Sequence, residues 1–316
     1  MITWILPVTC NNTCVIKMRY HKLSKYKIVF VFVTACALSI LFFKSVWHCH
    51  PNLRINATPV SEVRSAPYLH TEDENVFLPA DDVTLKQMNK NELWKMYWKY
   101  INTLQILCRN QIRLGPVKDG GKEICLDGIY KPRRPCLVYS FGSRFRFDFE
   151  LSVLSNFGCE IHTFDPSHQV RNRAIPTGIN FHLTGLWNSS ETNAYGWEMN
   201  TLDGVRKNLN HEKRVIDILK INIESAEWSA LPQMFQSGVL KYVKQMCIEI
   251  HFVSRKLRSV TFAQKLKVLR TLYEHSFHIF MHEHNLFSVK NFMDPYPVIT
   301  TANEISLINV NWKDVS

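Results

Sequence analysis

The sequence predicts an α/β protein built around a doubly wound, mainly parallel β-sheet. The prediction depends on short apolar runs that alternate with segments of helical periodicity along residues 136–316. Strands are expected at residues 136–141, 160–165, 179–184, 215–223, 242–250, 277–283 and 304–310. Helices are expected between them at residues 146–156, 199–210, 227–236 and 261–275.

The first expected strand leads into a small-residue turn, in the run Cys136-Leu-Val-Tyr-Ser-Phe-Gly142. The second expected strand ends in a carboxylate, Asp165, 23 residues after Gly142. In nucleotide-binding α/β units the turn admits the ligand, and the acid accepts hydrogen bonds from ribose hydroxyl groups. Two plainer interpretations stay open, namely an ordinary strand-ending glycine and a turn or cap acid before Pro166.

A third segment, residues 215–224, is typical of a buried parallel strand and ends at Glu224. The helix expected after it opens near Glu227, which is interpreted as an acid that favours a helix N-terminus. Ligands of open parallel sheets bind at the carboxyl ends of the strands. Gly142, Asp165 and Glu224 are therefore expected to face one crevice.

The runs CLVYSFG, EIHTFDPS, ILKINIESAEW and CIEIHF, in this order and spacing, resemble the FkbM-type class I methyltransferases. The resemblance covers roughly residues 95–315. It implies a Rossmann-like, seven-stranded sheet whose last strand lies antiparallel between its neighbours. It also implies S-adenosyl-L-methionine as cofactor and methylation of an oxygen on a small or glycan-like acceptor.

The resemblance also assigns the cofactor-binding residues. Backbone atoms of Ser140, Phe141 and Gly142 are expected to contact the amino-acid end of the cofactor. The remaining candidates are the ribose-binding Asp165 with the adjacent Pro166, and Asn222 on the third strand.

Two residues are candidates for catalysis, which requires alignment of donor and acceptor and removal of a proton. Glu224 could position the cofactor amine or the acceptor. His251, at the carboxyl end of the strand that contains Glu249, could take the acceptor proton with an unshifted pKa near neutrality. A structural histidine is the alternative.

The chain departs from the family pattern at two places. The loop after Gly142 is shorter, so that Arg144 could contact the cofactor carboxylate. Asn222 stands where the family commonly has Asp, and an amide cannot act as an anion or a proton acceptor. A scaffold that kept the fold and lost turnover is therefore an alternative function.

The N-terminal part predicts a single-pass type II membrane protein. Residues 1–27 have a formal charge of +5 and form the expected cytosolic tail, followed by an uncharged apolar run at residues 28–43. A stem at residues 44–84 and a helical extension at residues 85–135 would precede a catalytic domain at residues 136–316. A cleaved signal peptide is the competing interpretation, but no small-residue cleavage site follows the run.

A location in the lumen of the Golgi or endoplasmic reticulum agrees with two glycosylation sequons, at Asn56 and Asn188. Six cysteines follow the apolar run, and some should pair in an oxidising lumen. The better candidates are Cys108, Cys125 and Cys136, whereas Cys159 and Cys247 are interpreted as buried thiols in core strands.

The charges after residue 27 sum to +6, from 33 basic and 27 acidic residues. This moderate excess, without a basic cluster, does not support nucleic-acid binding and fits a small or glycan-like partner. A Golgi glycosyltransferase shares the predicted topology, but the chain has no Asp-x-Asp metal motif. His282 and His284 share one strand face without a third ligand, so no metal site is predicted.

Overall fold

The computed structural model describes residues 77–117, 119–167, 174–252, 260–290 and 299–313. The chain separates into two units, Met1–Ala66 and Pro67–Ser316, and every described residue belongs to the second. The predicted membrane segment, the sequon at Asn56 and Cys49 lie outside the described residues. Within the described ranges, no helix combines the length and apolarity needed to cross a membrane.

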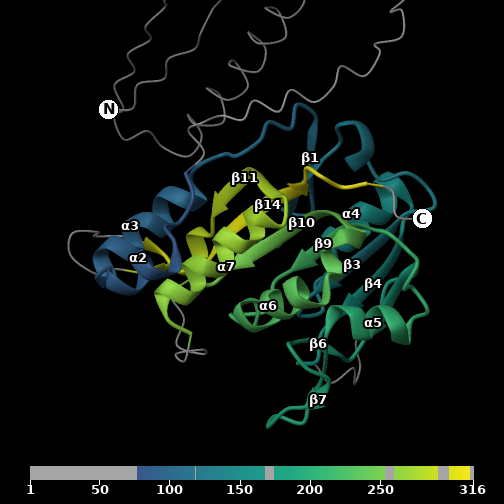
Figure 1. Ribbon diagram of the computed structural model, residues 1–316. Helices are drawn as coiled ribbons and strands as arrows, with labels where there is room; N and C mark the ends of the chain where they lie inside the picture. The colour runs from purple at the N-terminus through teal and green to yellow at the C-terminus, as the bar shows by residue number, and fades with distance from the viewer. Residues whose placement is uncertain (1–76, 118, 168–173, 253–259, 291–298, 314–316) are drawn as a thin grey trace, which may run out of the picture. The chain divides into compact units, whose positions relative to one another are not determined.

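A seven-stranded sheet forms the centre of the described part of the chain, as predicted (Figure 1). In spatial order its strands are β11 (Phe277–His284), β14 (Asn303–Asn309), β10 (Val243–Ile250), β9 (Ile216–Ile221), β3 (Leu137–Phe141), β4 (Glu160–Phe164) and β5 (Ile179–His182). β14 is antiparallel to both of its neighbours, and the pairs among β10, β9, β3, β4 and β5 are parallel. The seven strands and the antiparallel last strand between its neighbours are those that the family resemblance implies.

Helices cover the two faces of the sheet unequally. One face packs against α3 (Lys90–Ile101), α5 (Leu202–Asn208), α6 (Glu227–Ser237) and α7 (Phe262–Glu274). Figure 1 shows α5, α6 and α7 in front of the strands. Leu266, Leu269 and Leu272 of α7 are fully buried there, and each contributes roughly 2 kcal/mol of hydrophobic stabilisation.

The opposite face packs against α4 (Asp148–Phe157) and a ribbon of two antiparallel strands, β1 (Gln111–Leu114) and β2 (Lys122–Cys125). Side chains alternate along a strand, so Val138 and Ile218 join this second cluster while Tyr139 and Leu219 join the first. The prediction of helices on both faces therefore holds, but a β-ribbon takes the place of further helices on this face.

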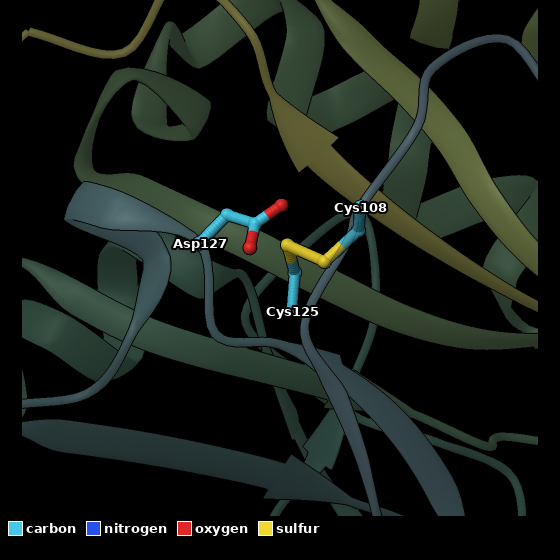
Figure 2. A group of neighbouring side chains, drawn as sticks. All are labelled: Cys108, Cys125 and Asp127. Atoms are coloured by element: carbon cyan, nitrogen blue, oxygen red, sulfur yellow. A yellow bond between two sulfur atoms is a disulfide. The ribbon is translucent and has the colours of Figure 1, made fainter. Parts of the chain in front are cut away.

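The helical extension predicted at residues 85–135 is α-helical only in its first part. α2 (Asp82–Gln87) and α3 cover its first part, and the chain then turns into β1. A disulfide between Cys108 and Cys125 fixes this turn (Figure 2). The carboxylate of Asp127 accepts hydrogen bonds from the amides of Arg109, at 2.6 Å, and Asn110, at 3.0 Å.

A second disulfide joins Cys136 and Cys159, just before β3 and β4 begin. Cys159 is therefore wrongly interpreted from the sequence as a buried thiol, because a strand-like context does not reveal that the neighbouring strand also begins with a cysteine. Cys247 is the free cysteine among the described residues and is buried, as predicted.

Two small sheets and three 3-10 turns complete the described part of the chain. β6 (Gly185–Leu186), β8 (Glu198–Asn200) and β7 (Glu191–Thr192) form a small sheet, and β12 (Val289–Lys290) pairs with β13 (Ile299–Thr300). The 3-10 turns are η1 (Gly128–Tyr130), η2 (Val239–Tyr242) and η3 (Leu286–Ser288). Strands of two or three residues carry too little periodicity to be predicted from sequence.

Candidate functional site

The strand order of the sheet reverses between β3 and β9. β3 pairs with β4 on one side and with β9 on the other, and the chain visits β4 and β5 before it returns to β9. Ligands of open parallel sheets bind at such a reversal, at the carboxyl ends of the strands. Gly142 follows β3 there, and Asn222 follows β9.

Gly142 and Asn222 are in direct backbone contact. Gly142 has a φ of 83°, and a Cβ at this position would lie 1.6 Å from the carbonyl oxygen of Asn222. The amide of Asn222 donates a 2.9 Å hydrogen bond to the carbonyl of Phe141. Phe141 and Ser140 are 0% exposed as whole residues, and the Phe141 ring stacks on Phe164, so of the three residues predicted to contact the cofactor only Gly142 is partly exposed at this edge.

Asp165 holds the turn that follows Gly142. Its Oδ2 accepts a hydrogen bond from the amide of Arg144 at 2.7 Å, and its Oδ1 accepts bonds from the amide and hydroxyl of Ser167 at 2.9 and 2.6 Å. Asp165 is 3% exposed. Both carboxylate oxygens thus already accept hydrogen bonds from the protein, which the prediction of a ribose-binding acid did not anticipate.

The turn itself has an unusual backbone. Arg144 and Phe145 have φ values of 49° and 57°, in the left-handed region that costs non-glycine residues about 1 kcal/mol or more. Phe145 is buried against Phe147 and Phe181, while the Arg144 side chain is exposed. Pro166, next to Asp165, lies half-buried beside β6.

The buried ammonium group of Lys220 stabilises the turn through hydrogen bonds. Nζ of Lys220, on β9, donates to the hydroxyl of Ser140 at 3.2 Å and to the carbonyl of Gly142 at 3.4 Å. It also lies 3.6 Å from Oε1 of Glu150 on α4, and the Ser140 hydroxyl donates to that same oxygen. Lys220 and Glu150 are 4% and 0% exposed.

Sequence reasoning missed both Lys220 and Glu150. The available signals were a lysine inside the apolar run of β9 and a glutamate on the apolar side of a helix. Burying two charges costs several kcal/mol per ion unless they are well paired. The pair therefore fixes Ser140 and Gly142 at a specific position at the strand end.

The turn from β9 into α6 contains two further residues with positive φ. Glu224 is exposed and has a φ of 57°, and Ser225 is buried and has a φ of 89°. The amide of Ser225 donates to Oε2 of Glu227 at 2.8 Å. The hydroxyl oxygen of Ser225 is buried without a hydrogen-bond partner among the described residues.

His251 lies at the end of β10, next to Glu227. Oε1 of Glu227 accepts a 2.8 Å hydrogen bond from the His251 amide and lies 3.2 Å from its Nδ1, and Oε2 of Glu249 lies 3.9 Å from Nε2. Although burial opposes the charged ring, Glu227, Glu249 and Glu224 raise the pKa of His251 to about 9. The expectation of an unshifted pKa is therefore wrong, and the ring is cationic at neutral pH.

Glu227 begins a helix and also pairs with His251. It is the first residue of α6, as predicted, and it is fully buried against His251. Trp228 is a core residue, and its indole donates to the carbonyl of His251 at 3.0 Å.

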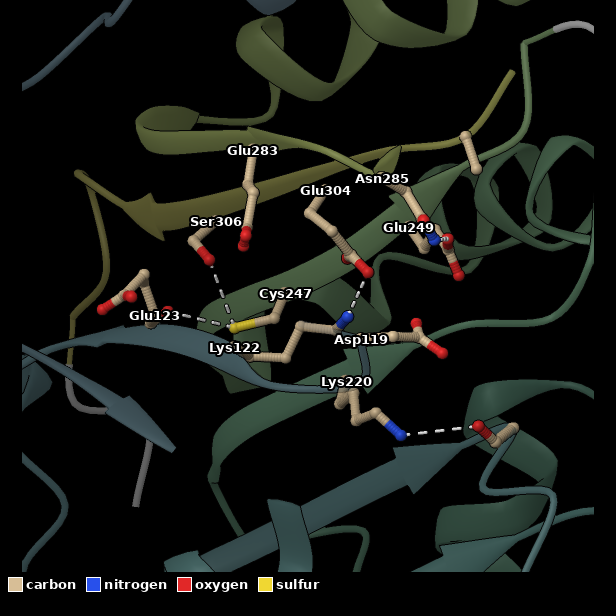
Figure 3. A network of polar contacts seen from close by, with 12 residues as sticks. Asp119, Lys122, Glu123, Lys220, Cys247, Glu249, Glu283, Asn285, Glu304 and Ser306 are labelled. Carbon is tan, nitrogen blue, oxygen red and sulfur yellow. Dashed lines mark hydrogen bonds and ion pairs between the residues drawn. The ribbon is translucent and has the colours of Figure 1, made fainter. Parts of the chain in front are cut away.

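Further ionic residues line the same edge over β10, β14 and β11. Figure 3 shows Lys122 of β2 pointing at Glu304 of β14, 2.5 Å away, and Glu249 beside Asn285. Burial favours the neutral amine of Lys122, but the carboxylate of Glu304 outweighs this effect and raises the pKa of Lys122. Neighbouring strands are about 4.8 Å apart, so this group lies roughly 10 Å or more from the turn at Gly142.

One cluster with metal-like spacing is not a metal site. Cys108, Cys125 and Asp127 bring potential ligand atoms together, but the two sulfurs are bonded to each other (Figure 2). A second cluster, away from this edge, is considered below.

A protein-family model described as "Methyltransferase domain" matches residues 70–295. This chain belongs to that methyltransferase family. Probable methyltransferase-like protein 24 of Homo sapiens is 30% identical over 176 residues, which are 51% of this chain and 47% of the relative. The Rattus norvegicus protein of the same name is 29% identical over 171 residues, 49% of this chain and 46% of the relative. The chain thus spans about half the length of the curated relatives it matches.

Proposed function

We propose that the protein transfers a methyl group from S-adenosyl-L-methionine to an oxygen of a small or glycan-like acceptor in the lumen of the secretory pathway. Membership of a methyltransferase family supports the reaction class. The observation that carries the proposal is the strand-order reversal, where Gly142, Asp165 and Asn222 meet at one edge.

The residues at this edge fit the cofactor. Gly142 is itself partly exposed, and Ser225 has a buried hydroxyl without a partner among the described residues. Asp165 would hold the ribose if a ribose hydroxyl replaced the Ser167 hydroxyl on Oδ1. The cofactor would supply an electrophilic methyl group. This chain would position that group and supply a side chain that takes the proton from the acceptor hydroxyl.

The acceptor hydroxyl must lose a proton as the new carbon–oxygen bond forms. Nε2 of neutral His251 can take that proton, because Nδ1 faces Glu227. With a pKa of about 9, roughly 2% of the rings are neutral at pH 7.4, so the rate should rise with pH. Glu224, exposed near the same ring, could orient the acceptor.

The acceptor class is supported by the acidic side chains at the edge. Glu249, bonded to Asn285, and Glu283, paired with Arg113, place carboxylates at this edge, and carboxylates disfavour nucleic-acid phosphates. Two disulfides among the described residues support an oxidising compartment. The apolar segment at residues 28–43 would anchor the protein, with the described domain on the lumenal side.

Calorimetric titration of S-adenosyl-L-methionine and S-adenosyl-L-homocysteine into the full-length protein tests the proposal. Asp165→Asn should weaken binding about 10- to 100-fold through loss of a charge-assisted hydrogen bond. Ser167→Ala should leave binding intact or strengthen it, because it removes one of the two hydrogen bonds that Oδ1 accepts from Ser167. Glu274→Gln, at the exposed end of α7, is the matched surface control. A folded wild-type protein that binds neither compound would overturn the proposal.

The occupied carboxylate of Asp165 and the amide at Asn222 favour one second candidate, a scaffold that binds cofactor without turnover. Methyl transfer to any acceptor in a library of sugars, measured with methyl-labelled cofactor, would exclude it. Binding without transfer, with activity gained by Asn222→Asp, would support it.

A further inference from the structure

A cluster of histidines lies near β4 and β5, on the face of the sheet that packs against α3, α5, α6 and α7. It lies away from the residues discussed above. Nε2 of His162 lies 2.8 Å from Oε1 of Glu160, and Nε2 of His211 lies 3.4 Å from the same oxygen. The three ligand atoms lie within 4.8 Å of one another. In a tetrahedral site with bonds of about 2.05 Å, ligand atoms are about 3.3 Å apart, close to both measured distances.

The second nitrogen of each imidazole also has a partner. Nδ1 of His162 lies 2.9 Å from Nε2 of His182, and Nδ1 of His211 lies 2.8 Å from the hydroxyl of Tyr139. Metal-binding histidines characteristically donate their other ring N–H to such a neighbour, which leaves the facing nitrogen free to bind the ion. Nε2 of His182 is placed to accept the N–H of His162 at Nδ1.

A protein cation reaches into the same cluster. Nη1 of Arg214 lies 2.6 Å from Oε2 of Glu160 and 3.1 Å from Nε2 of His211. The lone pair of that imidazole nitrogen therefore faces a positive charge. The Arg214 side chain is 33% exposed, so it can leave toward solvent.

We infer that Glu160, His162 and His211 bind a divalent transition-metal ion, with Arg214 in its place when the metal is absent. Two imidazoles and one carboxylate suit zinc, and the fourth position would be open to water at the 38% exposed Glu160. The ion would connect β4 to the segment between α5 and β9. His182 and Tyr139 would orient the two imidazoles.

The test is metal binding by the full-length protein, with cobalt(II) as a spectroscopic probe and zinc as competitor. We expect visible ligand-field absorption of a four-coordinate ion that zinc abolishes. Glu160→Gln and His211→Asn should each weaken the metal affinity more than tenfold. Tyr139→Phe should weaken it about 10- to 100-fold, as is typical when a residue that hydrogen-bonds to a metal ligand is replaced. His278→Asn, on β11 at the opposite end of the sheet, should change nothing.

Arg214→Gln gives the discriminating result. If the guanidinium competes with the ion, its removal should raise the affinity, which a misfolded variant could not do. Absorption that is absent in the wild type, or unchanged in both Glu160→Gln and His211→Asn, would overturn the inference. So would weaker binding in folded Arg214→Gln. Unfolding of each metal-free variant, followed by circular dichroism, separates a lost ligand from a lost fold.

Discussion

The carbonyl oxygen of Asn222 fills the space that a β-carbon on Gly142 would need, with 1.6 Å between the two positions. The carboxyl ends of β3 and β9 are therefore joined backbone to backbone at the point where the strand order reverses. Any side chain at residue 142 must separate them.

Gly142→Ala should lower the free energy of unfolding by about 3 to 4 kcal/mol, because it adds a backbone clash to the cost of a positive φ. Gly238→Ala is the matched control, since Gly238 has a φ of 67° and no atom within 4 Å of an added Cβ. It should cost about 1 kcal/mol. Equal losses in urea denaturation would contradict the importance of the Asn222 contact.

Lys220 and Glu150 should depend on each other. Lys220→Met alone leaves a buried carboxylate without its counter-charge and should cost about 3 to 5 kcal/mol. Lys220→Met combined with Glu150→Met should recover most of this loss. A double variant as unstable as the sum of the two single variants would show that the pair is not coupled.

His251 should titrate with a pKa near 9, which can be followed by the NMR shift of its ring carbon and assigned with His251→Asn. Glu227→Gln removes the nearest negative charge and should bring the pKa down toward 6.5. This measurement needs no acceptor. A wild-type pKa near 6.5 would remove the reason for expecting the transfer rate to rise up to pH 9.

The same residue should make stability depend on pH. Its pKa is raised in the folded state, so its contribution is complete below about pH 6.5 and is lost as the pH rises through 9. The difference in unfolding free energy between wild type and His251→Asn should therefore shrink over this range, by on the order of 3 kcal/mol. Denaturation curves at pH 6, 7.5 and 9.5 would show it, and a difference independent of pH would argue against the Glu227 pairing.

Each disulfide should contribute about 3 kcal/mol, because the two bridges close loops of 17 and 23 residues. Paired replacement of Cys136 and Cys159 by alanine should lower the melting temperature, and a reductant should have less further effect on that variant than on the wild type. Cys247→Ala serves as the control, since its cost comes from a small cavity and does not remove the response to reductant.

The sheet could be predicted because its strands are continuous apolar runs with turn residues between them. The seven strands lie within a few residues of the expected ranges, and the positions of Gly142, Asp165 and His251 at one edge followed from parallel topology. The ribbon β1–β2 could not be predicted, because its strands of four residues are defined by pairing and by the Cys108–Cys125 bond.

The site was less predictable than the fold. Residue type suggested that Asp165 would be open to a ligand, whereas its hydrogen bonds come from Arg144 and Ser167, whose positions depend on a strained turn. The pKa of His251 depends on Glu227, which is 24 residues earlier in the chain. Such contacts arise from tertiary packing and leave no local pattern.

The antiparallel insertion of β14 has a consequence for biosynthesis. β14 lies between β10 and β11 in the sheet, but it is the last of the seven strands in chain order. β10 and β11 therefore cannot be joined until β14 has left the ribosome. Until then one edge of β10 and the whole of β11 are unpaired, and their apolar side chains favour aggregation. Premature stop codons shortly before residue 303 should therefore produce chains that quality control degrades, even though all the candidate site residues have been translated.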